Sequence, residues 1–300
     1  MDRFDTLLAF VRVVEAGSFT KAAQTLHMSK TTVSQLVQQL EARLQVKLLN
    51  RTTRQVNVTP EGAAYYERVA RLLGDLQDAD DVLAGDLAAP RGRLRIDVPS
   101  PFARLVLMPA LPAFHQRYPE IQVVMGVSDR NVDVIGENVD CVLRGGDIGV
   151  PSLVARRVAD LPLGMYASPD YLRNTGMPAH PQALEHAPHR IVGYLRSSSG
   201  TIASIALRRG AEQVDIKGRY AVAADDGNAY VAAGLAGMGV LCVPRYMAQP
   251  HVKKGELTPL FEEWQLAPMP LCLAYPRNRH VSARLRVFMA WIDELAAQSL

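Results

Sequence analysis

Apolar residues recur at spacings of three and four along the first part of the chain, which is the period of amphipathic helices. The first run covers residues 3–15 and stops at Gly17, a residue typical of helix C-termini. A short run follows Ser18 and a longer one follows Ser29, and both serines stand where an N-cap is expected. The pattern predicts a helix-turn-helix, in which a short turn joins two helices.

The last of these helices has a polar face of Lys, Thr, Ser and Gln, side chains that reach phosphates and base edges in a major groove. The hairpin expected after it carries two arginines at its tip, suited to phosphates or a narrow minor groove. A helical hairpin with no DNA role is the alternative. The residues expected to contact DNA are Ser18, Thr20, Lys30, Thr31, Thr32, Ser34, Gln35, Gln38, Arg51, Thr52, Thr53 and Arg54.

A helical pattern runs without interruption from Pro60 to about Leu87. Its apolar residues step alternately by four and three, as in a heptad seam through which two copies of a helix pair. A single amphipathic helix packed on its own domain is the alternative. The seam predicted for dimerisation consists of Tyr65, Val69, Leu72, Leu76, Ala79 and Leu83.

Beyond a stretch of small residues at 85–92, the pattern alternates between strand and helix. Alternation of this kind predicts an α/β fold, and its weaker repetition later in the chain predicts two lobes with a ligand between them. Strands are expected at residues 93–99, 121–127, 139–144, 191–194, 216–222 and 240–244, with helices at 102–118, near 132–138 and from about 228.

Charge separates the same three segments. Residues 1–59 hold eight basic and four acidic residues, whereas residues 60–89 hold two basic and seven acidic ones. The total of +3 for 300 residues therefore conceals a basic head, an acidic connector and a larger mixed body. We expect domains at 1–59 (DNA-binding), 60–89 (linker and dimerisation) and 90–300 (effector-binding). Double-stranded DNA is the partner that a basic head favours.

The sequence resembles the LysR-type transcriptional regulators. The resemblance is dense over about sixty residues at the N-terminus and moderate through the body. In the head it rests on Phe10, Gly17-Ser18-Phe19, Ala22-Ala23, Leu26, Ser29, Val33-Ser34, Leu40-Glu41, Leu44, the segment from Leu48 to Arg54, and Thr59 to Gly62. In the body it rests on Tyr118-Pro119, Leu153 to Val158, Ala167 to Leu172 and Gly234 to Pro244.

The resemblance implies a winged helix-turn-helix rich in α-helix, a long dimerising linker helix and an effector domain similar to periplasmic binding proteins. The chain of such a domain crosses twice between its lobes, here near 157–163 and 266–272. Lobe I would take about 90–162 and 267–300, and lobe II about 163–266. Family contacts to DNA fall on Lys30, Thr31, Ser34, Gln35, Arg51 and Arg54. The sequence departs from the family at Gln45, usually Gly, at Leu49, often Phe, and at Gln35, often Arg.

Ligands of α/β sheets bind beyond the carboxyl ends of the strands, near helix N-termini. Hydroxyls and amides at such places suit a carboxylate, so we expect an organic acid as the effector. Ordinary turn residues and a surface arginine are the alternative. The residues expected to bind the effector are Ser100, Phe102, Val127, Ser128, Arg144, Tyr194, Ser197, Asp226 and Asn228.

Catalytic signatures are missing from the sequence, so an enzyme is not expected. A two-lobed binding protein or enzyme without a regulatory DNA role is the alternative. Three separated cysteines predict neither a disulfide nor a metal site and favour a reducing compartment, and neither a leader nor a membrane span is expected. The prediction is a cytoplasmic regulator that needs no cofactor or metal. Its partners would be a dyad-symmetric operator, a small-molecule effector, further copies in a homodimer, homotetramer or larger assembly, and RNA polymerase.

Overall fold

The computed structural model describes residues 2–51, 56–83, 90–130, 134, 139–146, 148–196, 199–277 and 281–299. The chain forms two compact units, Met1–Ala88 and Ala89–Leu300, which are described separately below. None of the helices in the described ranges is long and apolar enough to cross a membrane.

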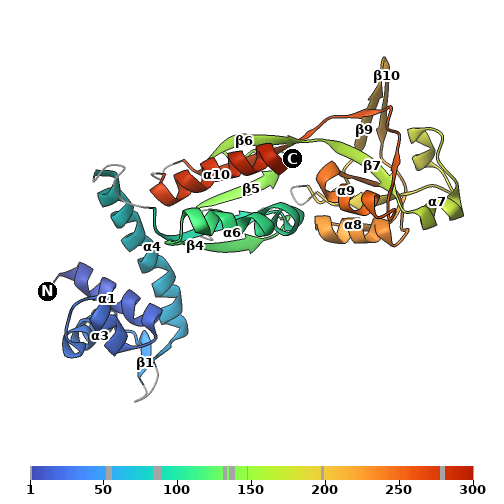
Figure 1. The fold of residues 1–300 in the computed structure, drawn as a ribbon. Coiled ribbons are helices and arrows are strands. Elements are labelled where there is room, and N and C mark those ends of the chain that lie inside the picture. Colours follow the sequence, from blue (N-terminus) through green and yellow to red (C-terminus); the bar gives the residue numbers. More distant parts are fainter. Residues whose placement is uncertain are drawn as a thin grey trace. The chain divides into compact units, whose positions relative to one another are not determined.

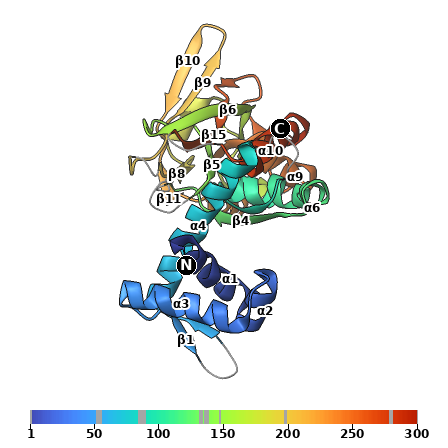
Figure 2. The same cartoon turned by 90° about the vertical axis from the view of Figure 1, so that its left-hand side faces the viewer.

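The first unit is a winged helix-turn-helix, as predicted (Figure 2). Two strands form an antiparallel hairpin after three helices, and a long helix follows. The elements are α1 (Arg3–Ala16), α2 (Phe19–Thr25), α3 (Lys30–Leu44), β1 (Leu49–Arg51), β2 (Val56–Val58) and α4 (Pro60–Leu83).

Local chemistry sets the helix ends in this unit. The hydroxyl of Ser18 accepts the amide of Lys21, and that of Ser29 accepts the amide of Thr32 at 3.0 Å, so both predicted N-caps are confirmed. Gly17 ends α1 in the left-handed conformation with φ of 59°. Gln45 ends α3 in the same conformation with φ of 53°, although its side chain makes this region unfavourable.

In the second unit, lobe I is built on a five-stranded sheet of order β4-β3-β5-β15-β6 (Figure 1). The strands β3, β4 and β5 run parallel, and β15 pairs antiparallel with β5 and β6. The elements are β3 (Gly92–Val98), α5 (Ser100–Phe102), η1 (Ala103–Leu107), α6 (Met108–Arg117), β4 (Ile121–Val127), β5 (Cys141–Gly145), β6 (Leu153–Leu161), β15 (Met269–Pro276) and α10 (Ala283–Ser299).

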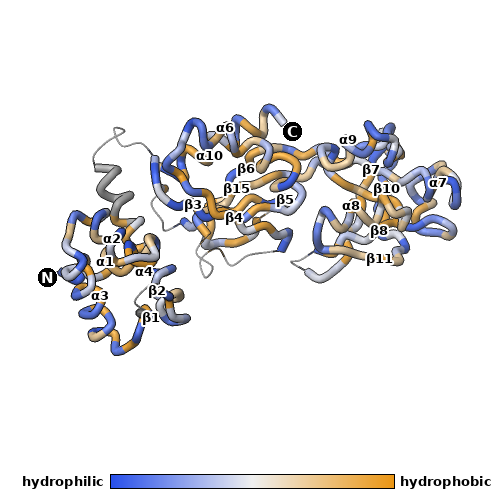
Figure 3. The backbone as a smooth tube through the Cα atoms, turned by 60° about the horizontal axis from the view of Figure 1, so that its bottom comes forward, coloured by the Kyte–Doolittle hydropathy of each residue, from blue (hydrophilic) through white to orange (hydrophobic). Residues whose placement is uncertain are grey.

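The core of lobe I lies between this sheet and the helices α6 and α10. Leu94, Ile96 and Val98 alternate along β3 and pack into one cluster with Phe114 and Trp291, whose rings lie 4.7 Å apart. Hydrophobic colouring accordingly runs through the strands of this sheet in Figure 3. Asp97, which lies between two of these residues in sequence, is directed to the opposite face, where it meets Arg144.

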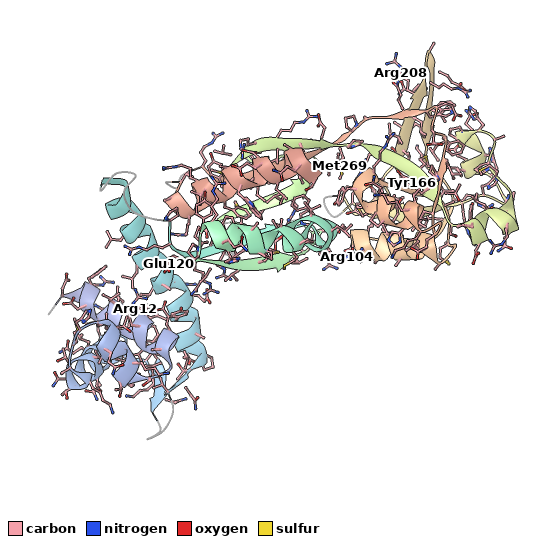
Figure 4. All side chains as sticks on the ribbon, in the orientation of Figure 1. Arg12, Arg104, Glu120, Tyr166, Arg208 and Met269 are labelled. Atoms are coloured by element: carbon pink, nitrogen blue, oxygen red, sulfur yellow. The ribbon has the colours of Figure 1, made fainter. Side chains whose placement is uncertain are left out.

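Lobe II consists of smaller sheets, of which β12-β7-β13 carries much of the core. Its β9–β10 hairpin projects from the lobe in Figures 1 and 2, and Figure 4 labels Arg208 on it. The elements are β7 (Leu163–Ala167), α7 (Pro169–Thr175), η2 (Pro181–Glu185), β8 (Ile191–Tyr194), β9 (Ile205–Arg209), β10 (Glu212–Ile216), β11 (Tyr220–Ala224), α8 (Gly227–Leu235), β12 (Leu241–Pro244), α9 (Arg245–Lys253), β13 (Thr258–Leu260) and β14 (Gln265–Leu266).

One strand prediction in lobe II is wrong. The run 216–222 is not a single strand, because β10 ends at Ile216 and β11 begins at Tyr220. Gly218 lies between them with φ of 55°, a conformation that breaks an extended chain. The helix predicted near 132–138 lies outside the described residues except for Val134, which is in a turn.

Candidate functional site

The recognition surface of the first unit is the polar face of α3. Lys30, Thr31, Gln35 and Gln38 are exposed, whereas Thr32 and Ser34 are half-buried. Residues three and four apart share a helix face, so Thr31, Gln35 and Gln38 form one exposed row. The opposite side of α3 is buried through Val33, Leu36, Val37 and Leu40.

Packing against α1 and α2 holds this helix in place. Ala22 and Ala23 of α2 are buried, and such small side chains allow close helix crossing. Ser18 is the N-cap of α2 and is half-buried, whereas Thr20 in its first turn is exposed. The wing residues Thr52, Thr53 and Arg54 lie outside the described residues, and so does the side chain of Arg51.

A buried carboxylate, which the sequence analysis did not identify as functional, joins α3 to the wing. Glu41 accepts the amides of Leu48 at 2.9 Å and Leu49 at 3.1 Å, and Lys47 Nζ lies 3.4 Å from it. The Thr59 hydroxyl donates to the Lys47 carbonyl at 2.8 Å and accepts the Gly62 amide at 2.9 Å. The place of Glu41 in the resemblance, next to an apolar position of α3, was the available signal.

Two of the six residues of the predicted dimer seam pack within their own chain. Val69 is 2% exposed in the core of the head, and the Tyr65 ring lies 5.9 Å from that of Phe10. The assignment of Val69 to a dimer interface is therefore wrong, because the core of the head already covers this side chain. Tyr65 is half-buried against α1, and its assignment stays a prediction. Leu72 and Leu76 are 62% and 45% exposed and stay available to a partner. The side chains of Ala79 and Leu83 lie outside the described residues.

The structure brings several of the predicted effector residues together where lobe I faces lobe II. The Asn228 amide at the start of α8 donates to the Ser100 hydroxyl at the start of α5, so these two predicted residues meet across the lobes. Asp226 caps α8 by accepting the Ala229 amide at 2.8 Å. Burial raises the pKa of Tyr194 to about 12, and the charges of Asp129, Asp226 and Asp225 add to this effect.

Other predicted effector residues are engaged in the protein itself. The side chain of Phe102 lies in the core of lobe I, at 1% exposure. Arg144 is buried, and its guanidinium pairs with Asp97 and donates to the Arg130 carbonyl at 3.0 Å. Val127 is exposed, the half-buried Ser128 donates its amide to the Val98 carbonyl at 3.1 Å, and Ser197 lies outside the described residues.

Asp129 lies at the centre of these residues and was missed. It follows Ser128 in the loop after β4, so the rule that placed Ser128 at a strand end could have included it. Its carboxylate accepts the Ser100 amide at 2.8 Å and the Gly227 amide. Burial raises its pKa above the ordinary value, and the two amide bonds and Arg144 oppose this effect.

Aromatic hydroxyls line the lobe II side of this region. Tyr230 accepts the Cys242 amide at 3.0 Å and stacks edge to face with Tyr194, with ring centres 5.4 Å apart. Burial raises the pKa of Tyr246, and the nearby charge of Asp129 contributes. The described residues contain no group of three or more His, Cys, Asp or Glu arranged to hold a metal ion. The contacts of Asp129, Asn228 and Tyr230 give this region hydrogen bonding and charge.

Both units match known families. Residues 4–63 match the bacterial regulatory helix-turn-helix protein family, lysR type, and residues 88–297 match the LysR substrate binding domain. A transcriptional repressor of Pseudomonas aeruginosa is 35% identical over 299 residues, covering 100% of this chain and 94% of that protein. The regulator CrgA of Neisseria meningitidis serogroup C is 33% identical over 297 residues, covering 99% of this chain and 98% of that protein.

Solved structures of LysR-type regulators also match this chain. The structure of CrgA from Neisseria meningitidis, a LysR-type transcriptional regulator, matches with a TM-score of 0.60 and 33% identity, over 96% of this chain and 97% of that one. The full-length virulence activator AphB of Vibrio cholerae matches with a TM-score of 0.58 and 26% identity, over 97% and 98%. The chain therefore belongs to the LysR family of DNA-binding transcriptional regulators, with a helix-turn-helix head and a substrate-binding domain.

Proposed function

We propose that this protein regulates transcription by binding double-stranded DNA through α3 and its wing, in response to a small molecule held between the two lobes. The observation that carries the proposal is the exposed polar row Thr31, Gln35 and Gln38 on a helix whose other face is fixed in a core. Such a helix presents amides and hydroxyls to base edges without having to reorganise. It acts in the cytoplasm, where such a partner is found.

The proposed DNA contacts outside the wing are Ser18, Thr20, Lys30, Thr31, Thr32, Ser34, Gln35 and Gln38. The wing residues Arg51, Thr52, Thr53 and Arg54 remain part of the proposal on the strength of their sequence. Gln35 pairs bidentately with adenine, where an arginine would prefer guanine. We therefore expect an operator with adenine at the base that Gln35 faces.

The acting species is at least a dimer. One head contacts too few base pairs to select a site, whereas two heads related by a two-fold axis read a palindrome. Leu72 and Leu76, one turn apart on α4, supply exposed apolar surface for this pairing. Ala79 and Leu83 extend the same seam in the sequence.

Fluorescence anisotropy with a labelled duplex from upstream of the gene tests DNA binding. Lys30→Ala is compared with Arg12→Ala, which removes the same charge from the exposed face of α1. We expect Lys30→Ala to weaken binding about tenfold and Arg12→Ala to change it less than twofold, since one lost contact costs about 1–3 kcal/mol. Equal losses in the two variants would reduce the effect to net charge and contradict the assignment of α3.

The effector class that we propose is an organic acid. Support comes from the amides of Ser100 and Gly227, which hold a carboxylate in the structure, although it belongs to the chain itself. Ser100, Asn228, Tyr194 and Asp226 stand around this position. Direct contacts from Phe102 and Arg144 are less favoured, because the first is in the core and the second is paired with Asp97.

Isothermal titration of the full-length chain with a panel of organic acids tests this effector class, with the primary amide of each acid as its matched control. We expect at least one acid to bind and its amide to bind at least tenfold more weakly, because only the acid carries a charge for the two backbone amides. Equal binding of acid and amide, or heat from neither across the panel, would reject an acidic effector.

A further inference from the structure

Four contacts join the two lobes around Asp129. Asp129 accepts the Gly227 amide, the Asn228 amide group donates to Ser100, Arg130 pairs with Asp225 at 3.1 Å, and Gly227 lies against Pro101. Residues 100–130 belong to lobe I and residues 225–228 to lobe II. The lobes are therefore in direct contact through their own side chains.

Asp129 links the first turns of two helical segments. The segment of residues 100–117 begins at Ser100, and α8 begins at Gly227. Amides in the first turn of a helix have no acceptor within the helix, so they need a partner from outside. One carboxylate supplies this partner to both lobes at once.

The buried side chain of Arg144 holds the loop that carries Asp129 in position. Arg144 donates to the Arg130 carbonyl at 3.0 Å and pairs with the buried Asp97. Gly126 makes room for that pair, because a Cβ atom there would fall 2.2 Å from an Asp97 carboxylate oxygen. Arg144 thus acts as a positioning residue for Asp129, which explains its burial better than a direct contact with an effector.

Two further features show that the contact is close and incomplete. A Cβ atom at Gly227 would lie 2.5 Å from Pro101 Cγ, so this approach of the lobes requires glycine. Within the described part of the chain, the buried Oδ1 atom of Asn228 has no hydrogen-bond partner. A buried acceptor without a donor is unfavourable, so the contact leaves one polar atom of the interlobe site unsatisfied.

We propose that Asp129 is a built-in carboxylate clasp, which closes the two lobes in place of the effector and which the acidic group of the effector displaces. The inference rests on the proposed function, because it concerns the same interlobe site. On this proposal, competition with Asp129 determines how tightly an acid must bind the site in order to displace it. An acid in solution competes with a tethered group whose effective concentration is high.

The clasp predicts chemical rescue in the full-length protein. In Asp129→Ala the Gly227 amide loses its acceptor, and we expect its hydrogen exchange, followed by mass spectrometry of peptides that contain it, to accelerate at least tenfold. Acetate has the same carboxylate without the tether. We expect acetate to restore protection in Asp129→Ala, whereas chloride at the same ionic strength does not, and the wild-type protein to show no change with either salt.

Asp170→Ala is the matched control, because Asp170 is a carboxylate in the first turn of α7 whose partner is Arg173 on the same helix. It should leave the exchange of Gly227 unchanged. Asp129→Asn keeps the shape of the side chain and loses its charge, so we expect intermediate exchange and weak rescue. This variant keeps the test decisive if Asp129→Ala fails to fold.

Two results would overturn the clasp: unchanged exchange at Gly227 in both Asp129 variants, or accelerated exchange that acetate and chloride leave equally fast. DNA anisotropy on the same samples separates this failure from failure of the proposed function. An intact DNA complex with no rescue rejects the clasp alone. Rescue without any DNA binding rejects the regulator and leaves the clasp standing.

Discussion

The buried carboxylate of Glu41 accepts the backbone amide of Leu48 at 2.9 Å and thereby ties the end of the recognition helix to the base of the wing. The same oxygen accepts the Leu49 amide. These bonds cross the turn after α3, so they fix the direction in which the wing leaves the helix. One side chain thus positions the two DNA-contacting elements proposed for the head, α3 and the wing, relative to each other.

Removing this carboxylate should destabilise the head. We expect Glu41→Ala to lower the free energy of unfolding by about 2–3 kcal/mol, because two buried amides lose a charged acceptor. Urea unfolding followed by circular dichroism measures the change. Glu15→Ala, which removes an exposed carboxylate paired with Arg12, should cost less than about 0.5 kcal/mol. Similar losses in both variants would contradict the structural role of Glu41.

Gln45→Gly should stabilise the protein. Gln45 has φ of 53°, and glycine adopts this conformation without the steric cost that a side chain brings. We expect a gain of about 0.5–1 kcal/mol, part of which is offset by the greater freedom of glycine in the unfolded chain. Ala42→Gly in the same helix should instead cost about 1 kcal/mol. A loss of stability in Gln45→Gly, measured in urea, would exclude strain at this position.

Leu72→Glu and Leu76→Glu should weaken dimerisation without unfolding the head. Both side chains are exposed in the single chain, so the substitutions remove no intrachain core packing. Placing a charge in an apolar interface should raise the dimer dissociation constant at least about tenfold. Analytical ultracentrifugation measures the constant, with Ala64→Glu on an exposed position of α4 outside the seam as the control. An unchanged dissociation constant in the leucine variants would show that Leu72 and Leu76 lie outside the dimer interface.

Arg51→Ala combined with Arg54→Ala should flatten the salt dependence of DNA binding. Each phosphate contact contributes about −0.9 to the slope of the logarithm of the association constant against the logarithm of salt concentration. We therefore expect the slope to fall in magnitude by about 1.8 when both arginines are lost. Anisotropy titrations over a series of salt concentrations give this slope. A slope equal to that of the wild-type protein would remove the wing from the phosphate contacts.

The titration of Asp129 should be visible as a pH dependence of stability. Burial raises its pKa, so the folded protein binds its proton more tightly than the unfolded chain does. Stability from this group is then present below the ordinary pKa of an aspartate and is lost as pH rises through the raised one. The free energy of unfolding of the wild-type protein minus that of Asp129→Asn should therefore decrease as pH rises from the ordinary pKa of an aspartate through the raised pKa of Asp129. A difference that increases with pH would reverse the direction of the shift.

Much of the head could be predicted because its signals are local. The helix spanning Arg3–Ala16 follows from its period of apolar residues, and the caps at Ser18 and Ser29 follow from side chains that bond within three residues. The exposed row on α3 follows from the same period. Such features depend on neighbours in sequence, so they can be predicted without knowledge of the rest of the fold.

The seam on α4 shows where a pattern stops being sufficient. A heptad pattern predicts that one face of a helix is covered, but it does not identify the element that covers it. Tertiary packing placed Val69 under α1 and left Leu72 exposed, only three residues later. The difference depends on which residues of the head pack against α4, and no local spacing records this.

By itself, the sequence determined the helix-turn-helix and the alternating α/β body, because the hydrophobic period acts over short stretches of chain. Only the tertiary structure decided that Arg144 pairs with Asp97, that Ser100 meets Asn228, and that Asp129 joins the two lobes. The residues in these contacts lie 47, 128 and 98 positions apart in the chain. Folding brings them together because sheet order and lobe closure, rather than sequence neighbourhood, determine which polar groups share a buried space.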